Sequence, residues 1–134
     1  MHMKALLLSS FLLFLLLFGC ARNIAQDRVI GSYVLKESNA ADELRLAPNG
    51  TYQHVSKGID GHESTASDVW RFETVDGEPT VVLKNFKCTA NGANSPGQGF
   101  FLMRVTSSWG RCRLWTDADK QEVYFEQTEE GLKP

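Results

Sequence analysis

The sequence predicts an all-β protein: an antiparallel, up-and-down meander of about eight strands that forms a small barrel, after an N-terminal signal helix. Beyond residue 28 the apolar side chains recur mostly at every second position, the period of a strand, and no helical period lasts three turns. Turn segments rich in Gly, Asn, Asp and Pro separate these runs. Closure into a barrel would remove exposed strand edges, and a two-sheet β-sandwich is the alternative.

The first 20 residues have the organisation of a secretory signal. Lys4 supplies the positive charge, and the apolar run 5–18 is shorter than the roughly 20 residues that a membrane-spanning helix needs. Leu17, Gly19 and Cys20 resemble the bacterial lipobox. That resemblance implies that Cys20 is lipidated and becomes the mature N-terminus. An ordinary cleaved signal and an uncleaved anchor are the competing interpretations.

The cysteine count fits lipidation. The chain has three cysteines, and an odd number in an exported protein leaves one thiol to explain. Acylation of Cys20 leaves Cys88 and Cys112, for which export permits a disulfide. We therefore expect a Cys88–Cys112 disulfide, with two buried free thiols as the alternative.

Removal of residues 1–19 would leave about 115 residues, the size of one domain. The expected segments are a signal peptide (1–19), a tether (20–27), a β-barrel domain (28–128) and a polar tail (129–134). The remainder carries 13 basic and 16 acidic residues, because only Lys4 is lost. Such a balance gives no reason to expect nucleic-acid binding.

Each expected strand is a run of alternating or continuous apolar residues between two turns. The eight runs are 29–36, 43–47, 51–57, 65–75, 80–88, 99–106, 111–116 and 121–128. The clearest turn is Pro48-Asn49-Gly50, since proline fixes its own φ and Asn-Gly accepts the positive φ of a tight hairpin. The longest expected loop is 89–98, which has no large apolar residue.

The middle of the chain resembles small bacterial lipocalin-like lipoproteins. The residues that carry the resemblance are Leu44, Leu46, the Pro-Asn-Gly-Thr-Tyr run 48–52, Trp70, Gly77 and the aliphatic run 81–83. The resemblance covers about half of the mature chain. It implies an up-and-down, calycin-type barrel and no specific ligand.

Two groups of aromatic residues are candidates for binding. Tyr33, Trp70 and Phe72 are expected to point inward and could line a lumen for a small apolar ligand. Trp109 lies in an expected turn beside Arg111 and Arg113, a combination typical of protein interfaces, although Trp109 could also fold back as a lid.

No catalytic or metal site is expected. The sequence has no nucleophile elbow, phosphate loop or His-Glu-x-x-His motif, and we expect no cofactor. After processing, His54 and His62 are the only histidines, and without a cluster of further ligands a structural role is expected for both.

These features predict a non-enzymatic lipoprotein of the bacterial cell envelope that binds a protein partner or a small apolar ligand. By resemblance to known lipoproteins, Ala21 rather than Asp after the cysteine implies the outer membrane if the organism is Gram-negative, with the domain facing the periplasm. An inhibitor or immunity protein that acts on an envelope enzyme through the 89–98 loop and the turn at Trp109 is the alternative.

Overall fold

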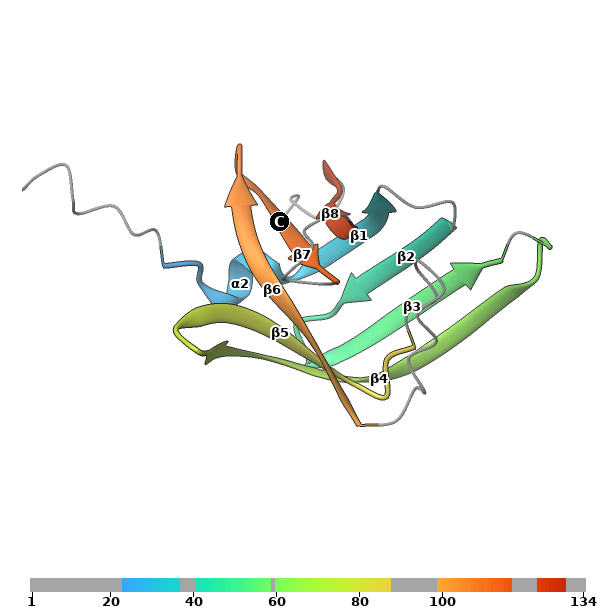
Figure 1. Ribbon diagram of the computed structural model, residues 1–134, viewed down its shortest axis with the longest axis horizontal. Helices are drawn as coiled ribbons and strands as arrows, with labels where there is room; N and C mark the ends of the chain where they lie inside the picture. The colour runs from blue at the N-terminus through green and yellow to red at the C-terminus, as the bar shows by residue number, and fades with distance from the viewer. Residues whose placement is uncertain (1–22, 37–40, 59, 88–98, 117–122, 130–134) are drawn as a thin grey trace, which may run out of the picture.

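The computed structural model describes residues 23–36, 41–58, 60–87, 99–116 and 123–129. One short helix precedes eight strands: α2 (Gln26–Val29), β1 (Gly31–Lys36), β2 (Ala41–Leu46), β3 (Thr51–Lys57), β4 (Glu63–Val75), β5 (Glu78–Lys84), β6 (Phe100–Ser108), β7 (Arg111–Trp115) and β8 (Tyr124–Gln127). Each strand pairs antiparallel with its neighbour in sequence, and β8 pairs back with β1 (Figure 1). The predicted closed meander is confirmed, and the two-sheet sandwich is excluded by the pairing of β1 with β8.

The interior of the barrel is filled by large apolar side chains from every strand. Inward residues alternate with outward ones, as in β2, where Asp42, Leu44 and Leu46 are buried and the residues between them are exposed. Fifteen buried side chains form one cluster: Val29, Tyr33, Leu44, Leu46, Tyr52, Trp70, Val81, Leu83, Phe86, Met103, Val105, Cys112, Leu114, Val123 and Phe125. Burial of this apolar surface is the main force that holds the barrel together.

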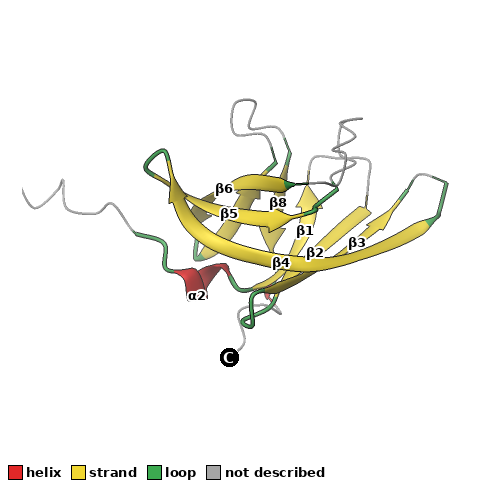
Figure 2. Ribbon diagram, turned by 90° about the horizontal axis from the view of Figure 1, so that it is seen from below, coloured by secondary structure: helices red, strands yellow, loops and turns green. Residues whose placement is uncertain are grey.

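One end of the barrel is covered by α2, which lies beside the start of β1 (Figure 2). Val29 is completely buried, and its carbonyl accepts a 2.5 Å hydrogen bond from the Tyr33 hydroxyl. The helix was not predicted. Residues 20–27 were assigned to a tether and Val29 to the first strand, whereas the helix runs through both and the strand begins at Gly31.

The side chain of Gln127 ties this covered end together. It is 2% exposed and accepts a 3.1 Å hydrogen bond from the backbone N–H of Cys112. Its amide donates to the carbonyls of Arg28 (3.0 Å) and Ile30 (3.1 Å). One residue of the last strand therefore bonds to α2, to the segment before β1 and to β7.

The predicted Pro48-Asn49-Gly50 turn joins β2 to β3. Gly50 has φ of +83°, and Asn49 Oδ1 accepts hydrogen bonds from the backbone N–H and the hydroxyl of Thr51. Trp70 holds this hairpin from β4: its indole N–H donates to the Ala47 carbonyl at 2.9 Å, and its backbone N–H donates to the Gly50 carbonyl at 2.9 Å.

Several predicted strand limits need correction, and those of β4 and β5 affect the shape of the barrel. The strand predicted at 80–88 ends at Lys84, because Asn85 has a left-handed backbone (φ +53°) and its side chain bonds to Asp68 and to the N–H of Gly99. The strand predicted at 65–75 begins earlier, at Glu63. As a result, the β3–β4 hairpin projects beyond the other strands (Figure 1), and the first residues of β4 are exposed on both faces.

Candidate functional site

The three predicted lumen residues lie on the inner face of the barrel, where they pack in the core. Tyr33 and Trp70 are 1% and 5% exposed, and Phe72 is partly buried against the same cluster. Burial raises the pKa of the Tyr33 hydroxyl far above its ordinary value. These side chains contact other core residues. The Tyr33 hydroxyl and the Trp70 indole N–H each donate a hydrogen bond to a backbone carbonyl. Binding of an apolar ligand among them would require the core to open.

Trp109 stands at the tip of the β6–β7 turn. Its side chain is 99% exposed, and its backbone has φ of +54°. It does not fold back as a lid, because a ring with that exposure has almost no contact with the barrel. The turn therefore presents an indole ring to the surroundings.

Arg111 and Arg113 lie on the outer face of β7 and are engaged in cross-strand contacts. Arg111 pairs with Glu129. The Arg113 guanidinium lies 3.5 Å from a Glu126 carboxylate oxygen and 4.8 Å from the centre of the Tyr124 ring. The structure brings the two arginines to one face, but it does not bring the exposed Trp109 ring into contact with either of them.

Cys112 is a free, completely buried thiol, so the expected disulfide with Cys88 is absent, and Cys88 itself lies outside the described residues. The Cys112 thiol donates to the Arg28 carbonyl at 3.4 Å, and burial raises the pKa of this thiol. The strand register places Cys112 far from the end of β5. Lys84 lies opposite Phe100 at the start of β6, whereas Cys112 lies opposite Ser107, seven residues and roughly 23 Å further along that strand.

The lipidation residue Cys20 and the predicted 89–98 loop also lie outside the described residues. No helix in the described part of the chain is both long and apolar enough to cross a membrane. Within the same part, no three His, Cys, Asp or Glu side chains come together as a metal site.

A buried contact between a histidine and an aspartate inside the barrel was not predicted from the sequence. His54 Nε2 lies 2.9 Å from Asp42 Oδ2, and the two side chains are 4% and 0% exposed. The imidazole also packs on the Phe86 ring, 4.6 Å between centres. Asp42 Oδ1 is buried and has no hydrogen-bond partner. The alternation of β2 could have placed Asp42 inward, since it lies two residues before Leu44 on the same face.

The outer wall formed by β4, β5 and β6 carries exposed apolar side chains. Val69, Phe100 and Leu102 are 49%, 57% and 47% exposed, and we call these three residues the outer apolar patch. The register places Leu102 opposite the buried Val82, and Arg71 lies over the Phe100 ring at 4.7 Å. Residues 99–106 were predicted to be apolar on both faces, and the outward half of that pattern forms this patch.

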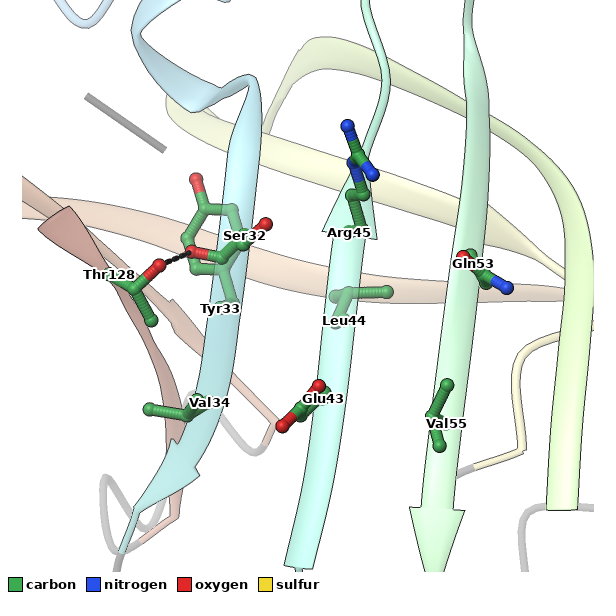
Figure 3. Close-up of a pocket in the computed structure, with 9 residues that line it drawn as sticks. All are labelled: Ser32, Tyr33, Val34, Glu43, Leu44, Arg45, Gln53, Val55 and Thr128. Carbon is green, nitrogen blue, oxygen red and sulfur yellow. Dashed lines mark hydrogen bonds between the residues drawn. The ribbon is translucent and has the colours of Figure 1, made fainter. Parts of the chain in front are cut away.

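The opposite wall carries a shallow groove across the outer faces of β1, β2 and β3 (Figure 3). Its volume is about 440 Å³, and it is lined by Ser32, Tyr33, Val34, Glu43, Leu44, Arg45, Gln53, Val55 and Thr128. In Figure 3 the side chains of Glu43, Arg45 and Gln53 point in different directions. They do not converge on one point, as the polar groups of a small-molecule site would.

No protein-family model, curated protein or solved structure matches this chain. The resemblances to the lipobox and to lipocalin-like lipoproteins therefore stay predictions from the sequence.

Proposed function

We propose that this chain is a lipid-anchored protein of the bacterial envelope, on the periplasmic side of the outer membrane, whose barrel binds a protein partner without catalysing a reaction. The outer apolar patch is the observation that carries the choice of a protein over a small apolar ligand. Contiguous exposed apolar surface is uncommon on isolated domains and marks interaction sites.

The patch has the chemistry of a protein interface. Phe100 and Leu102 offer apolar area, while Arg71 over the Phe100 ring supplies the kind of cation that interface centres favour. On the same face, Val82 of β5 lies between Arg71 of β4 and Leu102 of β6 and is itself buried, so the three strands share apolar packing beneath the patch. The filled interior supports the same choice, because a carrier of apolar molecules needs interior space that the core cluster occupies.

The anchor is tested by the mass of the exported protein. We expect wild-type protein to carry acyl chains such as palmitate and to remain with membranes, and Cys20→Ser to lose both. Cys88→Ser is the matched control, because it removes a cysteine that does not lie in the lipobox. Retention of the acyl mass in Cys20→Ser, or its absence from wild type, would contradict the proposed anchor.

The partner is tested by in-cell crosslinking of the full-length protein, followed by reconstitution with the purified crosslinked protein. The double variant Phe100→Ser/Leu102→Ser should weaken binding at least about tenfold, since two apolar side chains of the interface are lost. The matched control is Val34→Ser/Val55→Ser, which changes two aliphatic residues in the groove of the opposite wall. Loss of binding only in the control variant would place the partner in the groove and refute the patch.

The inhibitor or immunity interpretation is a special case of partner binding. It requires the partner to be an envelope enzyme whose activity falls on complex formation, which an activity assay of the reconstituted pair decides.

A further inference from the structure

The β6–β7 turn has an unusual residue for its geometry. Trp109 and Gly110 both have positive φ, +54° and +77°, as in the two-residue type I′ hairpin. The β4–β5 turn has almost the same angles, +52° at Asp76 and +78° at Gly77. Asp-Gly is a preferred pair for this turn, whereas a bulky residue with positive φ is rare and strained. The two turns therefore place an aspartate, Asp76, and a tryptophan, Trp109, in nearly the same backbone conformation.

Folding does not account for the tryptophan. A side chain that is 99% exposed buries no apolar surface in the barrel and gives nothing to offset the backbone strain. A strained residue with a fully exposed side chain points to a role outside the fold.

The turn lies at the barrel end that α2 covers. The Arg28 guanidinium donates to the Gly110 carbonyl at 3.5 Å, and the Cys112 thiol donates to the Arg28 carbonyl. The segment before α2 is held at the same place, because a groove there is lined by Asn23 and Ile24 together with Ser107 and Cys112.

The length of chain before this segment limits how far the anchor can lie from the barrel. Cys20 precedes Asn23 by three residues, which span at most about 11 Å when fully extended. A lipid on Cys20 would therefore hold the α2 end of the barrel next to the bilayer surface, and Trp109 projects from that end.

We infer that Trp109 inserts its indole ring into the lipid interface beside the anchor, so that the barrel stands on the membrane with its α2 end. This inference rests on the proposed lipid anchor. Tryptophan suits the site, because its apolar rings favour the acyl region and its N–H stays with the headgroups. The neighbouring charges nearly balance, with Asp27 beside Arg28 and Arg111 paired with Glu129. Insertion of the ring, and not attraction to anionic lipid, would then hold the turn, so added salt should leave it in place.

This orientation keeps the outer apolar patch away from the membrane. Leu102 lies seven residues before Trp109, roughly 23 Å along an extended strand. A partner could therefore reach the patch while the turn is in contact with lipid.

The test uses the full-length, acylated protein in vesicles of phosphatidylethanolamine and phosphatidylglycerol, with and without bromine on the acyl chains. Bromine quenches indole fluorescence only at short range. We expect quenching in wild type, at low and high salt, and its loss in Trp109→Asn. Because asparagine suits the turn, that variant should also melt a few degrees higher than wild type. The matched control, Asp76→Asn in the other type I′-like turn, should keep the wild-type quenching.

The outcomes separate this inference from the anchor on which it rests. Acylated wild-type protein without quenching overturns the membrane contact and leaves the anchor standing. Equal quenching in wild type and Trp109→Asn also overturns it, since the signal would then come from another tryptophan. Quenching that high salt abolishes would refute insertion of the ring. Absence of acylation removes both proposals. Trp109 that is unquenched in vesicles but shielded from oxidation in intact cells would assign the turn to a protein partner.

Discussion

Substitution of Gln127 tests how the barrel is closed. We expect Gln127→Leu, which keeps the approximate size of the side chain, to destabilise the fold by about 3 kcal/mol. The change leaves the buried Cys112 N–H and the partly buried Ile30 carbonyl without the bonds that Gln127 now provides, at about 1–3 kcal/mol for each. The Arg28 carbonyl keeps the Cys112 thiol as a donor. Greater apolar burial by leucine offsets roughly 1 kcal/mol of the loss.

Urea unfolding measures this effect. At a slope of about 1–3 kcal/mol per molar, the loss corresponds to a midpoint lower by roughly 1–3 M. Gln53→Leu is the matched control, because Gln53 is exposed on the outer face of β3, and its midpoint should stay close to that of wild type. Equal midpoints for the two variants would show that the hydrogen bonds of Gln127 do not hold the barrel closed.

Gln127→Glu separates the two halves of the interaction. The carboxylate still accepts from the Cys112 N–H, but it faces the Arg28 and Ile30 carbonyls without a proton to donate. Burial beside carbonyls raises the pKa of such a carboxyl group above its unfolded value. The loss of stability should therefore be larger at pH 7 than at about pH 4, where the protonated group donates again. A deficit that does not change with pH would contradict this assignment.

Further predictions concern the thiol, the buried pair and a tyrosine. Cys112 should react with iodoacetamide in a Cys88→Ser background only after unfolding, because the thiol is buried and its pKa is raised; fast native labelling, followed by mass spectrometry, would contradict its burial. His54→Phe should destabilise by about 3–5 kcal/mol by leaving the Asp42 carboxylate unpaired, and adding Asp42→Leu should restore part of that loss in thermal unfolding. Burial, with nearby Asp68, raises the pKa of Tyr52 to about 12, so its contribution to stability is complete below about pH 10 and is lost as the pH rises through 12. Tyr52→Phe should therefore show a shallower alkaline loss of stability than wild type between these pH values, and identical urea midpoints across that range would refute the assignment.

The sequence predicted the strands because alternation and turn chemistry are local. Leu44 and Leu46 lie on one face of β2 because they are two residues apart in a strand. The Pro48-Asn49-Gly50 turn depends only on the φ preferences of its own residues and on the Asn49 side chain. Closure followed from the number of strands and the absence of helices between them, and the pairing of β1 with β8 confirms it.

The sequence could not predict what depends on distant residues. The four-residue α2 is too short to have its own periodic pattern and is held by Tyr33 and Gln127, which bond to it from β1 and β8. The Cys88–Cys112 disulfide was predicted from the number of cysteines. The register along β6, which the sequence does not reveal, places Cys112 far from the end of β5. Lipidation of Cys20 stays a prediction, as does partner binding by Trp109.

The pairing of β1 with β8 also has a consequence for synthesis and export. Every other strand pair joins neighbours in sequence. The pairing of β1 with β8 instead joins Tyr33 to Gln127, which is synthesised 94 residues later. A chain that emerges N-terminus first can form its hairpins one after another, yet β1 keeps an open edge until the last strand arrives. Truncation after β7 should therefore leave a protein that aggregates through the unpaired edge of β1. A chaperone that covers this edge would bind the nascent chain and not the folded barrel.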